Sequence, residues 1–454
     1  MRGLEVDFKF HNVGQGLFYT GRLKYGRASF NFVYDCGSEK TSLVKDAINR
    51  EFQPDEEIDL LIVSHLHRDH TSGIPHLFKR ASNVDTVILP YLSPLERLIL
   101  ALTTPRASQE YYHFLADPVT YSLEHGVRRV VLVGGEEADR RENWMPPFEG
   151  PSDLPSDGRF GLIDELPQDE ELSSDYIRHM EPELSRSIGK GDVEVRNHSG
   201  VLKVVLNTVP IWVFRLFNYK LTPLNTLVAF RQCVEQKLGA VDSDAVKDAI
   251  RTMYRRKKNK NKYKQLVDCY IEEILRNSNL IPMCYHKNPK HWSTKSLTKY
   301  LGEHLNDLSL IMLHMPAFRF SSSKITCIHP YRGVCYQYNC TWCNPDSQEL
   351  SQFLTGDINL NCKLNEISQH FGLGTAIRNT VATLIPHHGS PNNWNNNLCN
   401  SINSNFWVVS AGIHNKYGHP SHQVLLDVCA NCWIPCVVWI NEAMYFRLMG
   451  TLQF

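Results

Sequence analysis

A cluster of metal-binding side chains follows directly on an aliphatic run near the start of the chain. Residues 61–70 read LIVSHLHRDH and contain His65, His67, Asp69 and His70. Residues i and i+2 of a strand point to the same side, so His65 and His67 can reach one ion together. The loop that follows can turn Asp69 and His70 towards a second ion. Imidazole with carboxylate suits zinc, manganese or iron. The alternative, a solvent-exposed polar loop, is disfavoured by the strand before the cluster and the TSG turn after it.

This segment resembles the HxHxDH signature of the metallo-β-lactamase fold, an αββα sandwich that holds two metal ions at one edge. Other segments match in the same order along the chain, and together they resemble the ComEC-type subgroup, named for the competence protein that contains such a domain. The matching segments are VGQG, DCG, HLHRDH, LTGD, HHGS and YGHP.

The resemblance implies a set of site residues. Six metal ligands would be divided between two ions: His65 and His67 on one, Asp69, His70 and His388 on the other, and Asp357 bridging both. Asp35 would orient the ligand loop, as metal-binding histidines usually require. Asp69, His387 and His419 would take part in catalysis, the two histidines as phosphate contacts or general acid. Two structural alternatives remain: His387 could support its neighbour, and His419 could cap the YGHP turn.

One position departs from the classical pattern. Classical members have a further histidine just before the strand that leads to the bridging aspartate. Here that strand is LSLIML, and Asn306 or Asp307 stands in this position with His304 nearby. The first metal site is therefore expected to be open or weakly ligated, and manganese fits as well as zinc.

Such a site favours hydrolysis. Two ions about 3.5 to 4 Å apart can hold a bridging hydroxide that attacks β-lactams, thioesters or phosphodiesters. Histidines in HHGS and YGHP suit contact with a phosphoryl oxygen, which favours phosphodiesters. The interpretation is a dinuclear metal-dependent hydrolase, a phosphodiesterase or nuclease that acts on DNA or RNA. The alternatives are a hydrolase of small phosphodiesters or cyclic nucleotides, and a non-catalytic scaffold in a multiprotein complex.

A basic run supports the choice of nucleic acid. Residues 251–264 read RTMYRRKKNKNKYK, in which cations could bind the phosphate backbone and tyrosines could stack on unpaired bases. The alternative is a solvated connector between two helices. The candidate contacts are Arg255, Arg256, Lys257, Lys258, Lys260 and Lys262.

The chain contains 13 cysteines. Cys327, Cys335, Cys340 and Cys343 have a spacing that could hold an additional structural zinc ion; otherwise they are unpaired thiols. Cys429, Cys432 and Cys436, next to an apolar strand, are expected to be buried. The start lacks a secretory signal and no apolar run approaches the roughly 18 to 20 residues of a membrane span. We therefore expect a cytoplasmic protein without membrane contact, with reduced cysteines and no disulfide framework.

The wider sequence must supply the elements that position these residues. Of 454 residues, 42% are hydrophobic and 21% are charged, and the formal net charge of zero excludes a globally basic nucleic-acid binder. Alternating strands and helices predict an α/β protein, an αββα sandwich with large helical and Cys-rich insertions that could also dock a partner protein. We expect three divisions. Residues 1–95 form the N-terminal half of the core, and residues 306–454 form its C-terminal half with the Cys-rich insertion (320–350). Between them, residues 96–305 hold further core strands, an acidic loop (146–187) and a helical, basic block (222–304).

Overall fold

The architecture was examined in a computed structural model. It describes residues 3–104, 106–135, 158–219, 222–239, 242–254, 260–276, 303–306, 308–318, 322–329, 333–334, 350–431 and 437–453.

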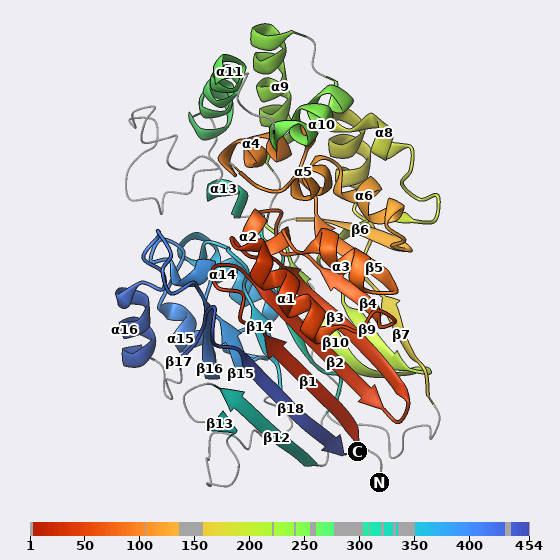
Figure 1. Ribbon diagram of the computed structural model, residues 1–454, viewed down its shortest axis with the longest axis vertical. Helices are drawn as coiled ribbons and strands as arrows, with labels where there is room; N and C mark the ends of the chain where they lie inside the picture. The colour runs from red at the N-terminus through yellow and green to blue at the C-terminus, as the bar shows by residue number, and fades with distance from the viewer. Residues whose placement is uncertain are drawn as a thin grey trace.

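Two mixed β-sheets pack face to face at the centre of the molecule (Figure 1). In the first sheet the strands from β13 to β3 pair antiparallel and those from β3 to β8 pair parallel. Their spatial order is β13 (Gly333–Val334), β12 (Ser322–His329), β18 (Phe446–Gln453), β1 (Leu4–Phe10), β2 (Phe18–Tyr25), β3 (Ala28–Cys36), β4 (Glu57–Ile62), β5 (Asn83–Pro90), β6 (Arg129–Gly134) and β8 (Val193–Asn197).

The second sheet has the same division into a parallel and an antiparallel half. Strands β17 to β14 are parallel and strands β14 to β7 are antiparallel. Their order is β17 (Val437–Ile440), β16 (Asn403–Ser410), β15 (Asn379–Leu384), β14 (Gln352–Leu354), β11 (Ile311–Pro316), β10 (Val209–Phe217), β9 (Leu202–Leu206) and β7 (Phe160–Asp164). This arrangement confirms the predicted α/β sandwich.

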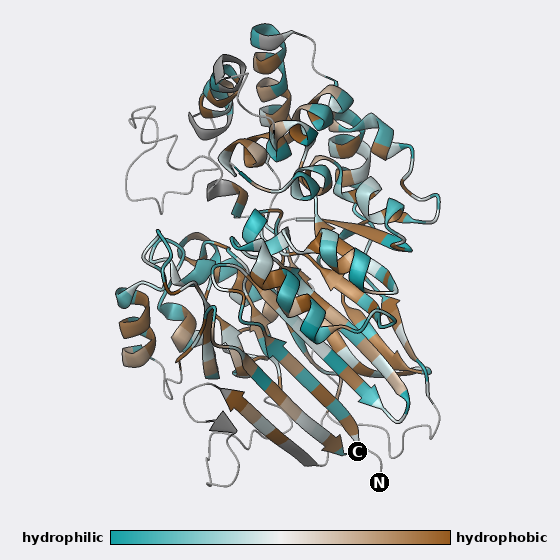
Figure 2. Cartoon of the chain, viewed as in Figure 1, coloured by the Kyte–Doolittle hydropathy of each residue, from teal (hydrophilic) through white to brown (hydrophobic). Residues whose placement is uncertain are grey.

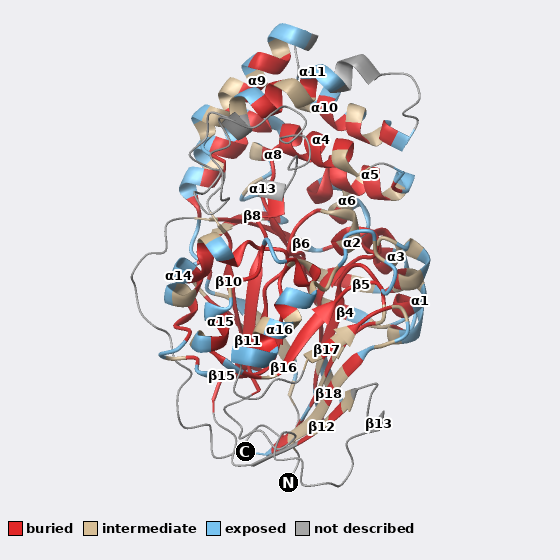
Figure 3. Ribbon diagram, turned by 90° about the vertical axis from the view of Figure 1, so that its left-hand side faces the viewer, coloured by how far each residue is buried: buried red, intermediate tan, exposed pale blue. Residues whose placement is uncertain are grey.

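Alternation along the strands explains why the sheets face each other. In β1 the side chains of Leu4, Val6, Phe8 and Phe10 are buried, and the residues between them are charged (Figure 2). Buried residues accordingly fill the strands of both sheets, and exposed residues gather on the outer helices (Figure 3). Burial of one face of each sheet is the main force that stabilises such a sandwich.

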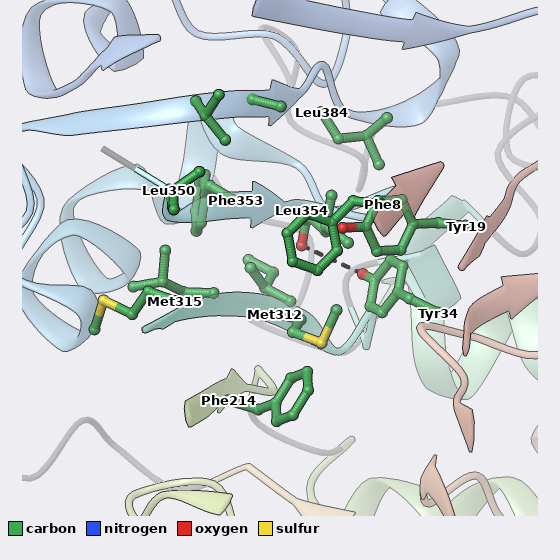
Figure 4. Close-up of a cluster of buried hydrophobic side chains, with 14 of the residues drawn as sticks. Phe8, Tyr19, Tyr34, Phe214, Met312, Met315, Leu350, Phe353, Leu354 and Leu384 are labelled. Atoms are coloured by element: carbon green, nitrogen blue, oxygen red, sulfur yellow. Dashed lines mark hydrogen bonds between the residues drawn. The ribbon is translucent and has the colours of Figure 1, made fainter. Parts of the chain in front are cut away.

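Polar side chains inside this core tie the two sheets together (Figure 4). The hydroxyl of Tyr34 in β3 donates to the carbonyl oxygens of Leu310 at 2.8 Å and Leu354 at 3.3 Å. His314 in β11 bonds to the Tyr19 hydroxyl at 2.8 Å and accepts from Trp212 Nε1 at 3.2 Å. These buried bonds favour one register of the sheets, because a shifted sheet would leave polar groups unpaired.

Helices cover the outer faces of both sheets (Figure 1). On the first sheet lie α1 (Thr41–Glu51), α3 (Ile74–Arg80), α4 (Pro94–Thr103), α5 (Gln109–Ala116) and α6 (Pro118–Glu124). On the second lie α14 (Leu360–Phe371), α15 (Asn397–Ser401) and α16 (His422–Asn431). No helix in the described ranges is long and apolar enough to cross a bilayer.

A helical insertion packs on α4 and α5, at the top of Figure 1. It contains α9 (Leu224–Leu238), α10 (Ser243–Arg251), α11 (Lys260–Tyr270) and the π-helical turn η3 (Ile271–Arg276). The sequence pattern had indicated α9 and the α11 region but not α10. The short helix α10 has an Asp242 side chain that caps its N-terminus, a signal that the sequence does contain.

The acidic segment differs from its prediction as a surface loop. From Phe160 onwards it forms β7 at the edge of the second sheet and then helical turns η1 (Leu172–Ile177), α7 (Arg178–Met180) and α8 (Pro182–Ser185). Leu172, Tyr176, Ile177, Met180 and Leu184 are buried. These apolar residues have the spacing of one helix face, but the acidic residues between them obscure that periodicity in the sequence.

The cysteines correct two expectations. Cys233 in α9 and Cys269 in α11 form a disulfide, and Cys362 is also disulfide-bonded, so the prediction of no disulfides is wrong. Cys429 is exposed rather than buried, and Cys432 and Cys436 lie outside the described residues. Of the candidate zinc ligands, Cys327 is a buried free thiol in β12, and Cys335, Cys340 and Cys343 lie outside the described residues. β12 joins the edge of the first sheet beside β18.

Candidate metal centre

The candidate ligands meet at one edge of the sandwich because they follow parallel strands. His65 comes three residues after β4, Asp357 three residues after β14, and His387 three residues after β15. The carboxyl ends of parallel strands are where α/β proteins place their binding sites. The helical turn α2 (Arg68–Thr71) then redirects the chain and presents Asp69 and His70 to the same space.

Asp357 occupies the middle of the cluster. Its carboxylate oxygens lie 3.6 Å from His65 Nε2, 3.3 Å from His70 Nε2 and 3.9 Å from His388 Nε2. His388 Nε2 also lies 3.2 Å from Asp69 Oδ2. Two groups have the geometry to hold an ion: His65, His70 and Asp357, and Asp69, His70 and His388. His70 belongs to both groups, and Asp357 belongs to the first and lies 3.9 Å from His388 of the second.

The histidine rings of the cluster are oriented so that their nitrogens could bind a cation. Nε2 of His65 and of His70 are buried without a hydrogen-bond partner, an arrangement that proteins rarely leave unfilled. The opposite ring nitrogens are held: His65 Nδ1 lies 2.9 Å from Ser64 Oγ, His70 Nδ1 2.7 Å from Asp35 Oδ2, and His388 Nδ1 2.6 Å from the Ser410 carbonyl. Such partners fix the ring and leave Nε2 free to bind a metal. These residues therefore fit divalent ions.

The charge state of the cluster fits the same conclusion. Burial holds the pKa of His65 well below its ordinary value, so this imidazole is neutral and its lone pair is available. Burial alone would raise the pKa of Asp357, but the charges of His70 and His387 outweigh it and keep that pKa well below its usual range. Against the effect of burial, Asp357 and Asp35 raise the pKa of His70, and Asp357 and Asp69 raise the pKa of His388, so these two imidazoles balance the charge of the carboxylates. Bound ions would replace their protons, because metal binding requires neutral imidazole and ionised carboxylate.

Asp35 supports the ligand loop from beneath. This fully buried carboxylate accepts the backbone N–H and the hydroxyl of Ser64, each at 2.6 Å, in addition to its contact with His70. Its backbone has a φ of +56°, which non-glycine residues adopt rarely and which marks a position constrained by its surroundings. Ser64 was missed by sequence reasoning, although it directly precedes the first histidine.

The two glycine motifs upstream have a steric explanation. A Cβ on Gly37, in DCG, would lie 2.4 Å from the backbone of His70. A Cβ on Gly16, in VGQG, would lie 2.6 Å from the carbonyl oxygen of Asp69. Leu17 N–H also donates to that carbonyl at 3.0 Å. Both motifs therefore allow backbone to pass directly against the ligand loop, which only glycine permits.

His67 is placed differently from the other ligand candidates. It is partly exposed, its ring centroid lies 4.9 Å from that of His65, and it belongs to neither of the two groups. Its Nδ1 is buried without a partner, and burial lowers its pKa to about 4. The structure thus groups His65 with His70 and Asp357, while His67 stands at the margin of the same cluster.

The two candidate catalytic histidines line the outer side of the cluster. His387 begins the 3-10 turn η6 (His387–Gly389), its side chain is partly exposed, and its Nε2 lies 3.6 Å from Asp357 Oδ2. His387 and His388 both have positive φ, a strain that tends to occur at functional sites. The His419 ring lies 6.0 Å from the His387 ring, and burial lowers its pKa to about 4.

Of the residues expected near the position of the additional classical histidine, the structure describes the side chain of Asn306. This residue ends α13 (Glu303–Asn306), is buried, and has an Oδ1 without a hydrogen-bond partner. The same segment reaches the cluster, since Asp357 N–H donates to Ser309 Oγ at 3.3 Å. Asp307 and the His304 side chain lie outside the described residues.

The candidate nucleic-acid contacts cannot be placed. Arg255, Arg256, Lys257 and Lys258 lie outside the described residues, as do the side chains of Lys260 and Lys262. Sequence reasoning did not single out two other residues near the cluster, the partly exposed Arg68 in HLHRDH and the exposed Tyr417 in YGHP.

Comparison with known families agrees with this geometry. Residues 26–159 match the model of the metallo-beta-lactamase superfamily, a range that includes the HLHRDH segment and strands β3 to β6. No curated protein gives a significant match to the chain. Asp357 and His388 lie beyond the matched range, and strands of the second sheet bring them next to the HLHRDH segment. Residues 26–159 therefore carry a metallo-beta-lactamase superfamily domain.

Proposed function

We propose that this protein is a dinuclear metal-dependent hydrolase that cleaves phosphodiesters. The observation that carries the proposal is the position of Asp357, within 3.3 to 3.9 Å of the Nε2 atoms of His65, His70 and His388. Buried side chains from both sheets converge there with unpartnered nitrogens, an arrangement that costs stability unless a cation fills it.

Each residue has a distinct part in this proposal. His65, His70, Asp357, Asp69 and His388 would hold the ions, with His67 at the margin. Bound divalent ions would supply Lewis-acid polarisation and an activated water. His387 is exposed enough to touch a substrate and would hold a phosphoryl oxygen or protonate the leaving alkoxide, with His419 beside it.

Phosphodiesters suit the rim of the site better than neutral acyl substrates. Arg68 adds a partly exposed cation within the ligand segment, between His67 and Asp69. Cationic and hydrogen-bond-donating side chains stabilise the negative charge of a phosphodiester in the ground state and the transition state. DNA or RNA is the substrate that we propose, and the six motifs support a place in the ComEC-type subgroup.

The proposal can be tested with purified protein and two kinds of substrate. Hydrolysis of bis(p-nitrophenyl) phosphate and of end-labelled single-stranded DNA, duplex DNA and RNA would be measured with added manganese or zinc. We expect metal-dependent cleavage that Asp357→Asn and Asp69→Asn each reduce at least ~100-fold. Asp59→Asn, which alters a largely buried carboxylate of β4 outside the cluster, is the matched control. Full activity in Asp357→Asn, or no hydrolysis of any of these substrates, would overturn the proposal.

A further inference from the structure

We propose that the site takes a single strand of nucleic acid, with an unpaired base stacked on Tyr417 and an adjacent phosphate bound by Arg68. This inference rests on the proposed phosphodiesterase function and narrows its substrate class. It draws on two side chains at the rim of the metal centre that the ligand cluster itself does not use.

Tyr417 presents an exposed aromatic ring beside the catalytic histidines, and the flexible side chain of Lys416 places its Nζ 4.7 Å from the ring centroid, where a base could displace it. The Tyr417 side chain is 49% exposed although it is large and apolar. Its ring is nearly parallel to that of His419, with 13° between the planes and 5.9 Å between the centroids. The His419 ring in turn lies 6.0 Å from that of His387, whose Nε2 is 3.6 Å from Asp357 Oδ2. An exposed ring in this position can extend a stack outward from the scissile phosphate.

The loop that carries Tyr417 is held in place before any substrate arrives. Asn415 accepts the N–H groups of Tyr417 and His419, each at 3.0 Å, and donates to the Gly412 carbonyl at 2.7 Å. The Tyr417 hydroxyl donates to Glu39 at 2.8 Å. A ring fixed in this way loses little conformational entropy when a ligand binds, which favours a role in recognition.

Arg68 supplies a cation within the ligand segment itself, between His67 and Asp69. It begins α2 within the HLHRDH segment and is partly exposed. Among the described residues no carboxylate lies within ion-pair distance of its guanidinium. By contrast, Lys40 and Lys416 are each paired, with Glu442 and Glu39.

An aromatic face and an unpaired guanidinium beside a phosphodiester-cleaving centre fit single-stranded nucleic acid. In a duplex the bases are already stacked on one another and their faces are covered. An unpaired base can stack on a tyrosine, a contact worth ~1–3 kcal/mol per base, which is a factor of about 5 to 150 in affinity. Small phosphodiesters without a base would use the metal centre but gain nothing from Tyr417.

The inference is tested by binding rather than by turnover. The full chain with manganese would be titrated into a fluorescent phosphorothioate oligothymidylate, which resists hydrolysis, and into the matching strand with abasic sugars. Fluorescence anisotropy gives both affinities. We expect the wild-type protein to prefer the strand with bases at least ~5-fold, and Tyr417→Ala to lose this preference. Tyr417→Phe, which keeps the ring, should retain it, and Tyr445→Ala is the control for an exposed tyrosine elsewhere.

The phosphate contact has its own readout. Each phosphate neutralised on a single strand contributes about −0.7 to the slope of log affinity against log salt. Arg68→Gln should therefore reduce the magnitude of this slope by ~0.7. Arg27→Gln, at an exposed position of the turn at the opposite end of β3, should leave it unchanged.

Two outcomes overturn the inference: equal affinity of the wild-type protein for the two strands, or a base preference that survives in Tyr417→Ala. Tight duplex binding with no single-strand preference would also contradict it. These results are separate from failure of the proposed function, which is read from hydrolysis of bis(p-nitrophenyl) phosphate. A protein that hydrolyses this reporter but ignores bases would keep the first proposal and lose the second.

Discussion

Asp35 shows how a single carboxylate outside the ligand set can control a metal centre. It receives two hydrogen bonds from Ser64 and contacts His70, so it sets the position of the loop and the orientation of one ring. A carboxylate behind a metal-binding imidazole also raises the basicity of the ring. Its influence on the ions is therefore indirect but strong.

We predict that Asp35→Asn lowers metal affinity by ~10- to 100-fold, because the amide cannot accept from Ser64 and His70 as the carboxylate does. Isothermal titration with manganese or zinc measures this loss, and circular dichroism verifies that the variant is folded. Asp59→Asn provides the matched comparison, since Asp59 accepts a backbone N–H of Asn31 but lies outside the cluster. Unchanged affinity in Asp35→Asn would show that the ligand loop holds its shape unaided.

His314 leads to a prediction about stability against pH. Burial lowers its pKa to about 3, against 6.5 in the unfolded chain, and Trp212 donates to its Nδ1. The unfolded state therefore binds the proton first as the pH falls. The contribution of His314 to the free energy of unfolding is therefore complete above pH 6.5. It falls by about 1.4 kcal/mol per pH unit as the pH drops from 6.5 towards 3.

A His314→Gln variant should show a shallower loss of stability between pH 6.5 and pH 4 than the wild-type protein. Urea unfolding at several pH values gives the two slopes. His422→Gln, at an exposed histidine at the start of α16, is the control and should follow the wild-type curve. Parallel curves for wild-type and His314→Gln would mean that His314 does not titrate between the two states.

Sequence reasoning at the residue scale succeeded where a motif names both the residue type and its place. HLHRDH, LTGD and HHGS led to side chains that the structure brings together around Asp357. It did not foresee that His65 would group with His70 rather than with His67, because α2 turns the chain immediately after the histidines. It also missed Ser64 and Tyr417, whose roles depend on partners far away in the sequence.

At the scale of elements, a buried ionic network joins the helical insertion to the core helices. Arg97 of α4 contacts Glu181 at 2.7 Å, and Lys247 of α10 contacts both Glu181 and Asp117 at 2.8 Å. All four side chains are buried and their charges balance. Removing one partner from such a network leaves a buried charge without compensation.

Glu181→Gln should therefore destabilise the protein by ~3–5 kcal/mol, because Arg97 and Lys247 lose their shared carboxylate. Denaturant unfolding followed by tryptophan fluorescence measures the change. Glu183→Gln, two residues away in an exposed pair with Arg186, should cost less than ~1 kcal/mol. Equal effects of the two substitutions would rule out a special role for the buried network.

The acidic segment shows why elements are harder to predict than motifs. Its apolar residues Leu172, Tyr176 and Met180 have helical spacing, but acidic and small residues dominate the composition around them. Long-range pairing of β7 with β9 then adds a strand that local pattern does not favour. Helix α9, which has an apolar stripe and no such competition, lies within the helical block that the sequence predicts for residues 222–304.

At the scale of the whole molecule, the metal centre connects two halves of the chain that lie far apart in the sequence. His65, Asp69 and His70 follow strands of the first sheet, and Asp357 and His388 follow strands of the second. The order of motifs was sufficient to predict this convergence. The path of β12, which leaves the second-sheet region and pairs with β18 in the first sheet, was not predictable from motifs, because no local signal specifies which sheet edge a strand joins.

Because the ions would link both sheets, their binding should stabilise the entire fold. A ligand that binds only the native state stabilises it by about 2.7 kcal/mol at a concentration 100 times its dissociation constant. We therefore predict that chelation lowers the unfolding temperature by several degrees and that manganese or zinc restores it, as measured by calorimetry. The Asp69→Asn, Asp357→Asn double variant should show no such response, since it lacks a ligand from each sheet. If the double variant responds as strongly as the wild-type protein, the stabilising ions bind elsewhere; if neither responds, the cluster does not hold ions tightly enough to join the two sheets.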